Sequence, residues 1–317
     1  MFEQMPSPVR INEVVTRDGF QSEPEFVPTE YKIELINALS TLGLNKIEVT
    51  SFVSPRAIPN LRDAEEVMRN INRDTDTTYV ALVPNEKGCQ RALELEVDEI
   101  NLVMSVSESH NLANMRMRCQ QSLDQFSRIA ELTANTAMRL NGSLATAFGC
   151  PFEGVLGEDR VLYYIEQYLD RGLHSITLAD TTGMAVPNQV YSLCRAVRQA
   201  YPDLEVTLHF HNTRGLGLSN VLAALEAGIN QFDASLGGLG GCPFAPGATG
   251  NICTEDLVHM LEEMGLDTGV DLAALLQQSA RLEQMLGHSL PGQVRQAGPR
   301  SLTRPLPESV QQLMQNS

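Results

Sequence analysis

The sequence predicts an α/β protein of the (β/α)8 class, a closed TIM barrel of eight parallel strands with extra C-terminal helices. Eight short runs rich in β-branched and apolar residues alternate with longer segments of helical period. Eight such units in about 240 residues match a closed barrel better than an open, doubly wound sheet. The doubly wound alternative is also disfavoured because no Gly-x-Gly-x-x-Gly motif follows the first run.

The expected strands are short and the segments between them carry helical stop signals. The strands are predicted at 9–15, 44–50, 77–83, 99–105, 142–148, 174–180, 204–211 and 229–236. Four of the intervening segments have apolar residues three and four apart and end in Gly or Pro: 28–43, 157–172, 186–202 and 213–228. The pattern is therefore that of repeated strand–helix units.

The C-terminal part divides into helices and a tail. Residues 254–287 have helical periodicity and extend the barrel. We therefore expect a catalytic domain over residues 1–287. The last segment, 288–317, is rich in Pro, Gln and Ser and is predicted to be a weakly ordered tail.

Composition excludes several classes of protein. The chain has 317 residues, is 43% hydrophobic and carries a net charge of −16, which argues against a disordered chain and against nucleic acid or anionic membranes as partners. The sequence contains no run of 18 apolar residues, so it does not predict a membrane-spanning helix. Six dispersed cysteines without a CxxC pair, and a start without a secretory signal, predict a cytoplasmic location.

Polar residues gather at the expected strand ends, where a barrel of this class places its active site. The first strand runs into Arg17 and Asp18, the second carries Glu48, and the sixth ends at Asp180. The seventh ends in a His-x-His sequence, and the eighth leads into a glycine-rich segment over 235–251. Titratable side chains at so many strand ends are unlikely to serve only to pack the core, so we expect them to form a functional site.

The sequence predicts a divalent metal site around His209 and His211. Two histidines at i and i+2 of a strand point to the same face, here the barrel interior. With the carboxylate of Asp18 they would form an N,N,O ligand set, to which Asn251 could add an amide oxygen. Hard oxygen ligands favour Mg²⁺ or Mn²⁺ over a closed zinc site. The other histidines (110, 174, 259 and 288) have no such pattern and are expected to be structural.

Cys242 allows two interpretations. A free cysteine is commonly a small apolar filler, but a thiol in a glycine-rich segment over a metal site is well placed to carry a proton. The glycines could also suggest a phosphate cradle, which is weakly supported because no Gly-Lys-Ser/Thr ending follows.

Six motifs resemble the 3-hydroxy-3-methylglutaryl-CoA lyase family. They occur in order between about residue 8 and residue 270: EVVTRDGFQSE (13–23), IEVTSFVSP (47–55), FGCPFEG (148–154), LADTTG (178–183), HFHNTRG (209–215) and GGLGGCPFAPGATGN (237–251). The resemblance implies a metal-dependent barrel lyase that cleaves a 3-hydroxyacyl-CoA to acetyl-CoA and a keto acid. Its partner would be a small-molecule acyl-CoA substrate.

The resemblance also implies a role for each matched residue. Asp18, His209, His211 and Asn251 become metal ligands, and Arg17 becomes the cation that faces the substrate oxygen. Glu48 and Asp180 become orienting acids, with Asp180 the first candidate for the general base. Cys242 becomes the thiol that helps to move the proton. The expected substrate-binding residues are Gln21, Asn114, Arg116 and Arg214.

Three departures from the family's common pattern leave the acyl group open. Pro24 stands where Lys is usual, Arg214 stands where Tyr is usual, and 114–118 replaces a simple Asn-x-Asn. An added arginine could meet a differently placed carboxylate, as in citramalyl-CoA. The alternatives are therefore a citramalyl-CoA lyase giving pyruvate, a condensing synthase, an aldolase, and a non-catalytic acyl-CoA-binding barrel. A homo-oligomer is expected only from the general behaviour of barrels.

Overall fold

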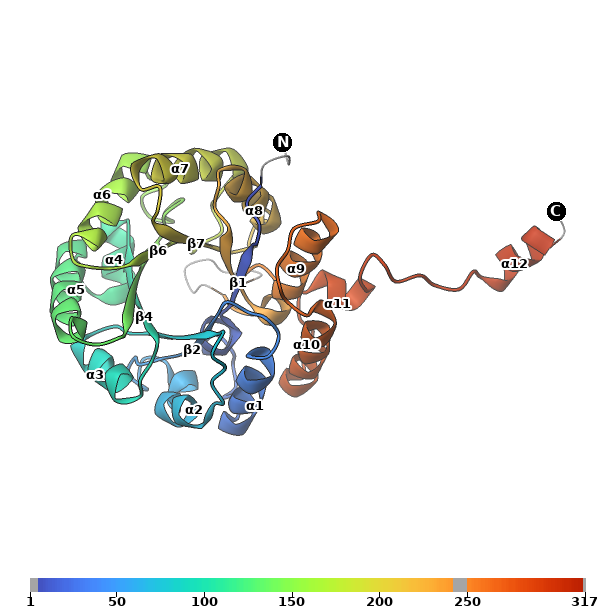
Figure 1. Cartoon of the computed structure of the whole chain (residues 1–317), viewed down its shortest axis with the longest axis horizontal. Coiled ribbons are helices and arrows are strands. Elements are labelled where there is room, and N and C mark those ends of the chain that lie inside the picture. Colours follow the sequence, from blue (N-terminus) through green and yellow to red (C-terminus); the bar gives the residue numbers. More distant parts are fainter. Residues whose placement is uncertain (1–4, 242–249, 316–317) are drawn as a thin grey trace.

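The computed structural model describes residues 5–241 and 250–315, and it confirms the predicted closed barrel (Figure 1). All eight strands run parallel in sequence order, and the last pairs with the first. The strands are β1 (Arg10–Glu13), β2 (Lys46–Ser51), β3 (Thr78–Leu82), β4 (Glu99–Ser105), β5 (Arg139–Ala145), β6 (Ser175–Asp180), β7 (Glu205–Phe210) and β8 (Gln231–Ala234).

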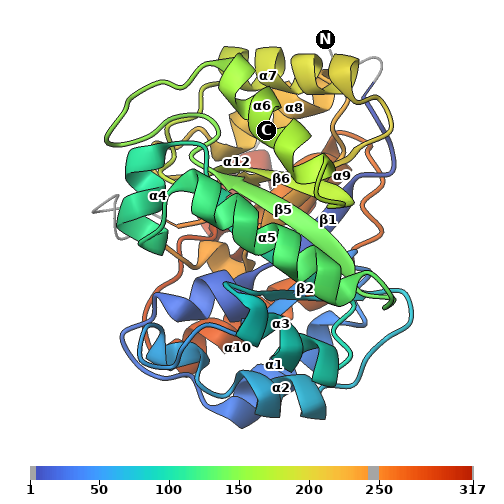
Figure 2. The same ribbon diagram turned by 90° about the vertical axis from the view of Figure 1, so that its left-hand side faces the viewer.

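Helices surround the barrel (Figures 1 and 2). They are α1 (Thr29–Leu39), α2 (Ala64–Asn70), α3 (Glu86–Glu94), α4 (Glu108–Met115), α5 (Cys119–Thr133), α6 (Glu158–Leu169), α7 (Pro187–Ala200) and α8 (Gly217–Glu226), followed by α9 (Thr254–Glu263), α10 (Leu272–Leu286), α11 (Gln293–Ala297) and α12 (Glu308–Gln315). Two 3-10 turns lie at Pro59–Leu61 and Leu236–Gly238. The connection from β4 to β5 holds two helices instead of one.

The helices pack on the barrel through their apolar stripes. In α6, Val161, Ile165 and Tyr168 are buried, as the spacing within 157–172 predicts. Tyr168 lies so close to β5 that a Cβ on Gly142 would come 2.1 Å from the tyrosine ring. Only glycine fits this close approach of helix and strand.

Packing against the barrel continues beyond the domain boundary predicted at residue 287. Leu290 is 1% exposed and lies against Gly237, and the Gly292 N–H donates to the Gly237 carbonyl. The segment after α11 then extends away from the barrel and leads into α12 (Figure 1). None of the helices in the described part of the chain is long and apolar enough to cross a membrane.

Candidate active site

A π-helical turn, Val15–Gly19, brings the first two site residues to the mouth of the barrel. β1 ends at Glu13, whose buried carboxylate accepts hydrogen bonds from the Val15 and Leu236 N–H groups, both at 2.9 Å. Burial raises the pKa of Glu13 to about 8. The turn that follows buries Arg17 and Asp18, and π-turns of this kind are often found at functional sites.

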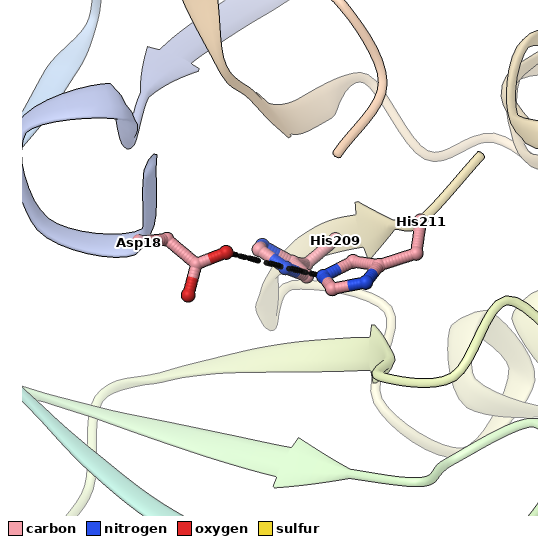
Figure 3. Close-up of side chains that lie close together, drawn as sticks. All are labelled: Asp18, His209 and His211. Carbon is pink, nitrogen blue, oxygen red and sulfur yellow. Dashed lines mark hydrogen bonds and ion pairs between the residues drawn. The ribbon is translucent and has the colours of Figure 1, made fainter. Parts of the chain in front are cut away.

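Asp18, His209 and His211 form the predicted triangle of ligand atoms (Figure 3). The two His Nε2 atoms lie 3.2 Å apart. Asp18 Oδ2 lies 4.0 Å from His209 Nε2 and 3.9 Å from His211 Nε2. All three side chains are buried, and nitrogen and oxygen ligands about 2 Å from one ion are separated by similar distances. The geometry and the donor set therefore fit one divalent cation.

The electrostatics keep two of these groups in the forms that bind a cation. Burial raises the pKa of Asp18, but Arg17 and both histidines outweigh burial and lower that pKa to about 2. Burial and the neighbouring His209 lower the pKa of His211 to about 4. At neutral pH, Asp18 is thus a carboxylate and His211 a neutral imidazole with a free lone pair.

Asn251 reaches the same centre from the far side of the glycine-rich segment. Its amide Nδ2 donates to Asp18 Oδ2 at 2.7 Å and to the Leu239 carbonyl at 3.0 Å. The amide nitrogen therefore faces Asp18, and a ligand role would require the amide to turn its oxygen inward. Asn251 as a metal ligand stays a prediction.

Glu48 and Asp18 hold the guanidinium of Arg17. Arg17 Nε donates to Glu48 Oε2 at 2.5 Å, and Nη1 donates to Asp18 Oδ1 at 2.5 Å. Burial lowers the pKa of Arg17, but these two carboxylates outweigh it, so the net change is upward and the cation is permanent. Glu48 is in turn held by Asn101 Nδ2, 3.1 Å from its other oxygen. The predicted orienting contact between Glu48 and Arg17 is therefore present.

Asp180, at the end of β6, has one oxygen that accepts hydrogen bonds and one that accepts none from the described residues. Oδ1 accepts hydrogen bonds from the backbone N–H groups of Met184 at 2.7 Å and Ala185 at 3.1 Å. Oδ2 is buried and has no hydrogen-bond partner among the described residues. Burial raises the pKa of Asp180 to about 6. A carboxylate with a pKa near neutrality and an open lone pair is suited to accept a proton.

The residues predicted to bind substrate have different surroundings. Gln21 Nε2 donates to Asp18 Oδ1 at 2.9 Å, so Gln21 lies at the centre itself. Arg214 Nη1 donates to the carbonyls of Thr182 at 2.9 Å and Gly183 at 2.7 Å, on the segment after Asp180. Asn114 and Arg116 are exposed at the end of α4. Cys242 lies outside the described residues, so its role stays a prediction.

Sequence reasoning missed Asp233 on β8. Its Oδ2 lies 3.2 Å from His209 Nδ1, on the side of the imidazole opposite the ligand nitrogen. This contact helps to raise the pKa of His209 against the lowering effect of burial. The available signal was a carboxylate at an alternate position of a barrel strand, between Gln231 and Ser235.

Comparisons with known proteins agree with this arrangement. The family model described as HMGL-like matches residues 8–281. The chain is 43% identical to the hydroxymethylglutaryl-CoA lyase of Bacillus subtilis, covering 90% of this chain and 96% of that protein. It is 42% identical to the (R)-citramalyl-CoA lyase of Chloroflexus aurantiacus, covering 92% and 95%.

A solved structure is also similar over nearly its whole length. It is an HMG-CoA lyase from Acinetobacter baumannii in complex with coenzyme A and 3-methylmalate. The identity is 56% and the TM-score 0.91, over 94% of this chain and 98% of the other. Fold, site and relatives together define a carbon–carbon lyase built on a (β/α)8 barrel. The chain belongs to the HMGL-like family.

Proposed function

We propose that this protein is a divalent-metal-dependent lyase that cleaves 3-hydroxy-3-methylglutaryl-CoA, or a closely similar thioester, to acetyl-CoA and acetoacetate. The observation that carries the proposal is the buried triangle of Asp18, His209 and His211 at the barrel mouth, with further carboxylates beside it. Asp18 and Glu48 share one buried cation, Arg17, and Asp233 lies beside His209. A buried site with this imbalance and two imidazole Nε2 atoms 3.2 Å apart is suited to a bound cation.

The metal would be held by Asp18, His209 and His211, with Mg²⁺ or Mn²⁺ as the expected ion. When bound, it would lower the pKa of a hydroxyl that coordinates it and orient the substrate. Asp180 Oδ2 is assigned to accept the proton of the C3 hydroxyl, directly or through one water. The C2–C3 bond then breaks, its electron pair moves to C2 as the acetyl-CoA enolate, and C3 becomes a ketone.

Arg17 is assigned to stabilise the charge that develops during this step. Glu48 and Asp18 engage Nε and Nη1, which fixes the plane of the guanidinium. We assign Nη2 to the substrate oxygen that becomes negative. The enolate must finally take one proton at C2, and Cys242 is the proposed donor because a thiol is mostly protonated at neutral pH.

A citramalyl-CoA lyase activity is the second candidate. Arg214 stands beside the segment after Asp180, where its guanidinium could meet a substrate carboxylate. The relatives named for the two activities are also almost equally similar to this chain, at 42% and 43% identity. The products would then be acetyl-CoA and pyruvate.

A substrate panel tests the proposal. The purified protein is incubated with Mg²⁺ and with hydroxymethylglutaryl-CoA or either enantiomer of citramalyl-CoA, and acetyl-CoA, acetoacetate and pyruvate are measured. Release of acetyl-CoA with acetoacetate supports the first assignment, and release with pyruvate supports the second. Failure to cleave any of these thioesters with Mg²⁺ or Mn²⁺ would contradict both. The cytoplasmic location and homo-oligomeric state stay predictions.

A further inference from the structure

His209 and His211 differ on the side of the ring that faces away from the proposed metal. His209 Nδ1 lies 3.2 Å from Asp233 Oδ2. His211 Nδ1 is buried and has no hydrogen-bond partner among the described residues. The two histidines of the same motif are thus held in different ways, and only His209 has a carboxylate behind it.

Asp233 is itself held by Asn12 on β1, and Asn12 is held in turn by Asn45, the residue before β2. Asn12 Nδ2 donates to Asp233 Oδ1 at 2.9 Å, and Asn45 Nδ2 donates to Asn12 Oδ1 at 2.9 Å. In the sheet, Asp233 pairs with Asn12 on β1 and with His209 on β7. Asp233 therefore lies between its hydrogen-bond donor and its histidine by the register of the barrel, and both of its oxygens are engaged.

The direction of these hydrogen bonds determines which His209 nitrogen carries the proton. Each amide in the series donates toward Asp233, and an ionised carboxylate only accepts. His209 must therefore place its proton on Nδ1 to complete the contact. In the neutral imidazole, Nε2 is then left with a lone pair, and Nε2 is the atom that faces His211 Nε2 and Asp18.

We infer that Asp233 is a positioning residue that holds His209 as the Nδ1–H tautomer and turns its Nε2 toward the metal. This inference rests on the proposed metal site, because Asp233 contacts His209, one of the three proposed metal ligands, and not the metal itself. Carboxylates behind metal-binding histidines commonly change metal affinity by about 10- to 100-fold. A purely structural role for Asp233 would instead change stability and leave the tautomer unaltered.

Two measurements test the inference: Mn²⁺ affinity by electron paramagnetic resonance, and the His209 tautomer by ¹⁵N NMR of histidine-labelled protein. The His209 resonance is assigned by its loss in His209→Ala. With Mg²⁺ bound, the wild type should show the Nδ1–H tautomer, a result that needs no variant at Asp233 to fold. Asp233→Asn should weaken Mn²⁺ binding about 10- to 100-fold and redistribute the His209 proton toward Nε2.

Glu205→Gln is the matched control. It also removes one carboxylate charge from the barrel interior, on the same strand as His209, but Glu205 pairs with Lys46 and Arg139 instead of a histidine. Its Mn²⁺ affinity should stay within about twofold of wild type. Asn12→Ala, which leaves the carboxylate in place, should lower affinity less than Asp233→Asn.

The outcomes separate this inference from the proposed function. If His209→Ala binds Mn²⁺ as tightly as wild type, the metal site itself is wrong. If His209→Ala loses Mn²⁺ while Asp233→Asn keeps wild-type affinity and tautomer, only the role of Asp233 is overturned. A wild-type His209 with its proton on Nε2 would overturn that role as well.

Discussion

The two ends of the barrel interior both bury charged side chains, but they do so in different ways. At the N-terminal end, Lys46 Nζ lies 2.8 Å from Glu99 and 2.9 Å from Glu205, and Arg139 lies 2.7 Å from Glu205. Burial lowers the pKa of Lys46, but the two glutamates outweigh it and the pKa is raised. Two cations face two carboxylates, so this end is neutral by itself.

At the C-terminal end the charges do not balance. Arg17 pairs with two carboxylates, those of Asp18 and Glu48. One oxygen of Asp180 has no hydrogen-bond partner among the described residues, and two imidazole Nε2 atoms face each other. Buried groups in such an arrangement cost stability unless a ligand satisfies them. From this difference we assign the first end to the support of the barrel and the second end to the proposed binding of a cation and a substrate.

The largest effect is expected from removing a metal ligand. His209→Ala and His211→Ala should each abolish turnover, because each removes one of the proposed ligands at the unbalanced end. Acetyl-CoA release measures turnover, and circular dichroism checks that the fold is kept. EDTA should inactivate the wild type, and Mg²⁺ or Mn²⁺ should restore it. Full activity of metal-free protein would contradict the metal site.

Asp180→Asn should lower kcat by about 10²- to 10⁴-fold, because the amide cannot take the hydroxyl proton. The raised pKa of about 6 also predicts a pH profile. The base must be ionised, so kcat/KM of the wild type should fall about tenfold per pH unit as the pH drops below about 6. The amide variant should lack this acidic limb. A wild-type profile that stays flat from pH 7 to pH 5 would exclude Asp180 as the base.

Arg17→Gln should lower kcat by about 10²- to 10³-fold with a smaller change in KM. The guanidinium is proposed to act on charge that develops only as the carbon–carbon bond breaks, so its loss affects the transition state more than the bound substrate. Steady-state kinetics with saturating Mg²⁺ measures both constants. A raised KM with unchanged kcat would make Arg17 a binding residue instead.

Lys46→Met tests the N-terminal end of the barrel interior and should have the smallest effect on turnover of the variants compared. It also removes a buried cation, and it leaves Glu99 with Arg139, at 3.7 Å, in place of the closer Lys46. Removing one partner of a buried ion pair commonly costs about 3–5 kcal/mol of stability. The midpoint of urea unfolding should fall, while kcat of the folded protein should stay within about twofold of wild type. If Lys46→Met instead reduced kcat as strongly as Arg17→Gln, the division of the barrel into two ends would be wrong.

The sequence predicts the barrel and most of the candidate centre because both leave local signals. Alternating strand and helix patterns repeat along the chain, and the His-x-His spacing alone places two imidazoles on one face of β7. The first strand was predicted to continue to residue 15, but it ends at Glu13 and a π-turn follows. That turn follows from contacts of Glu13 with residues more than two hundred positions away, which no local pattern records.

By itself, the sequence determined the class of fold, the Asp18, His209 and His211 centre and the family. Only the tertiary structure decided that Asp233 lies behind His209, that Arg214 donates to the backbone after Asp180, and that Lys46 joins Glu99 and Glu205 inside the barrel. The physical reason is the separation along the sequence of the residues that make contact. Periodicity and motif spacing act over a few residues of one element, whereas these contacts depend on the register between strands that closure of the barrel sets.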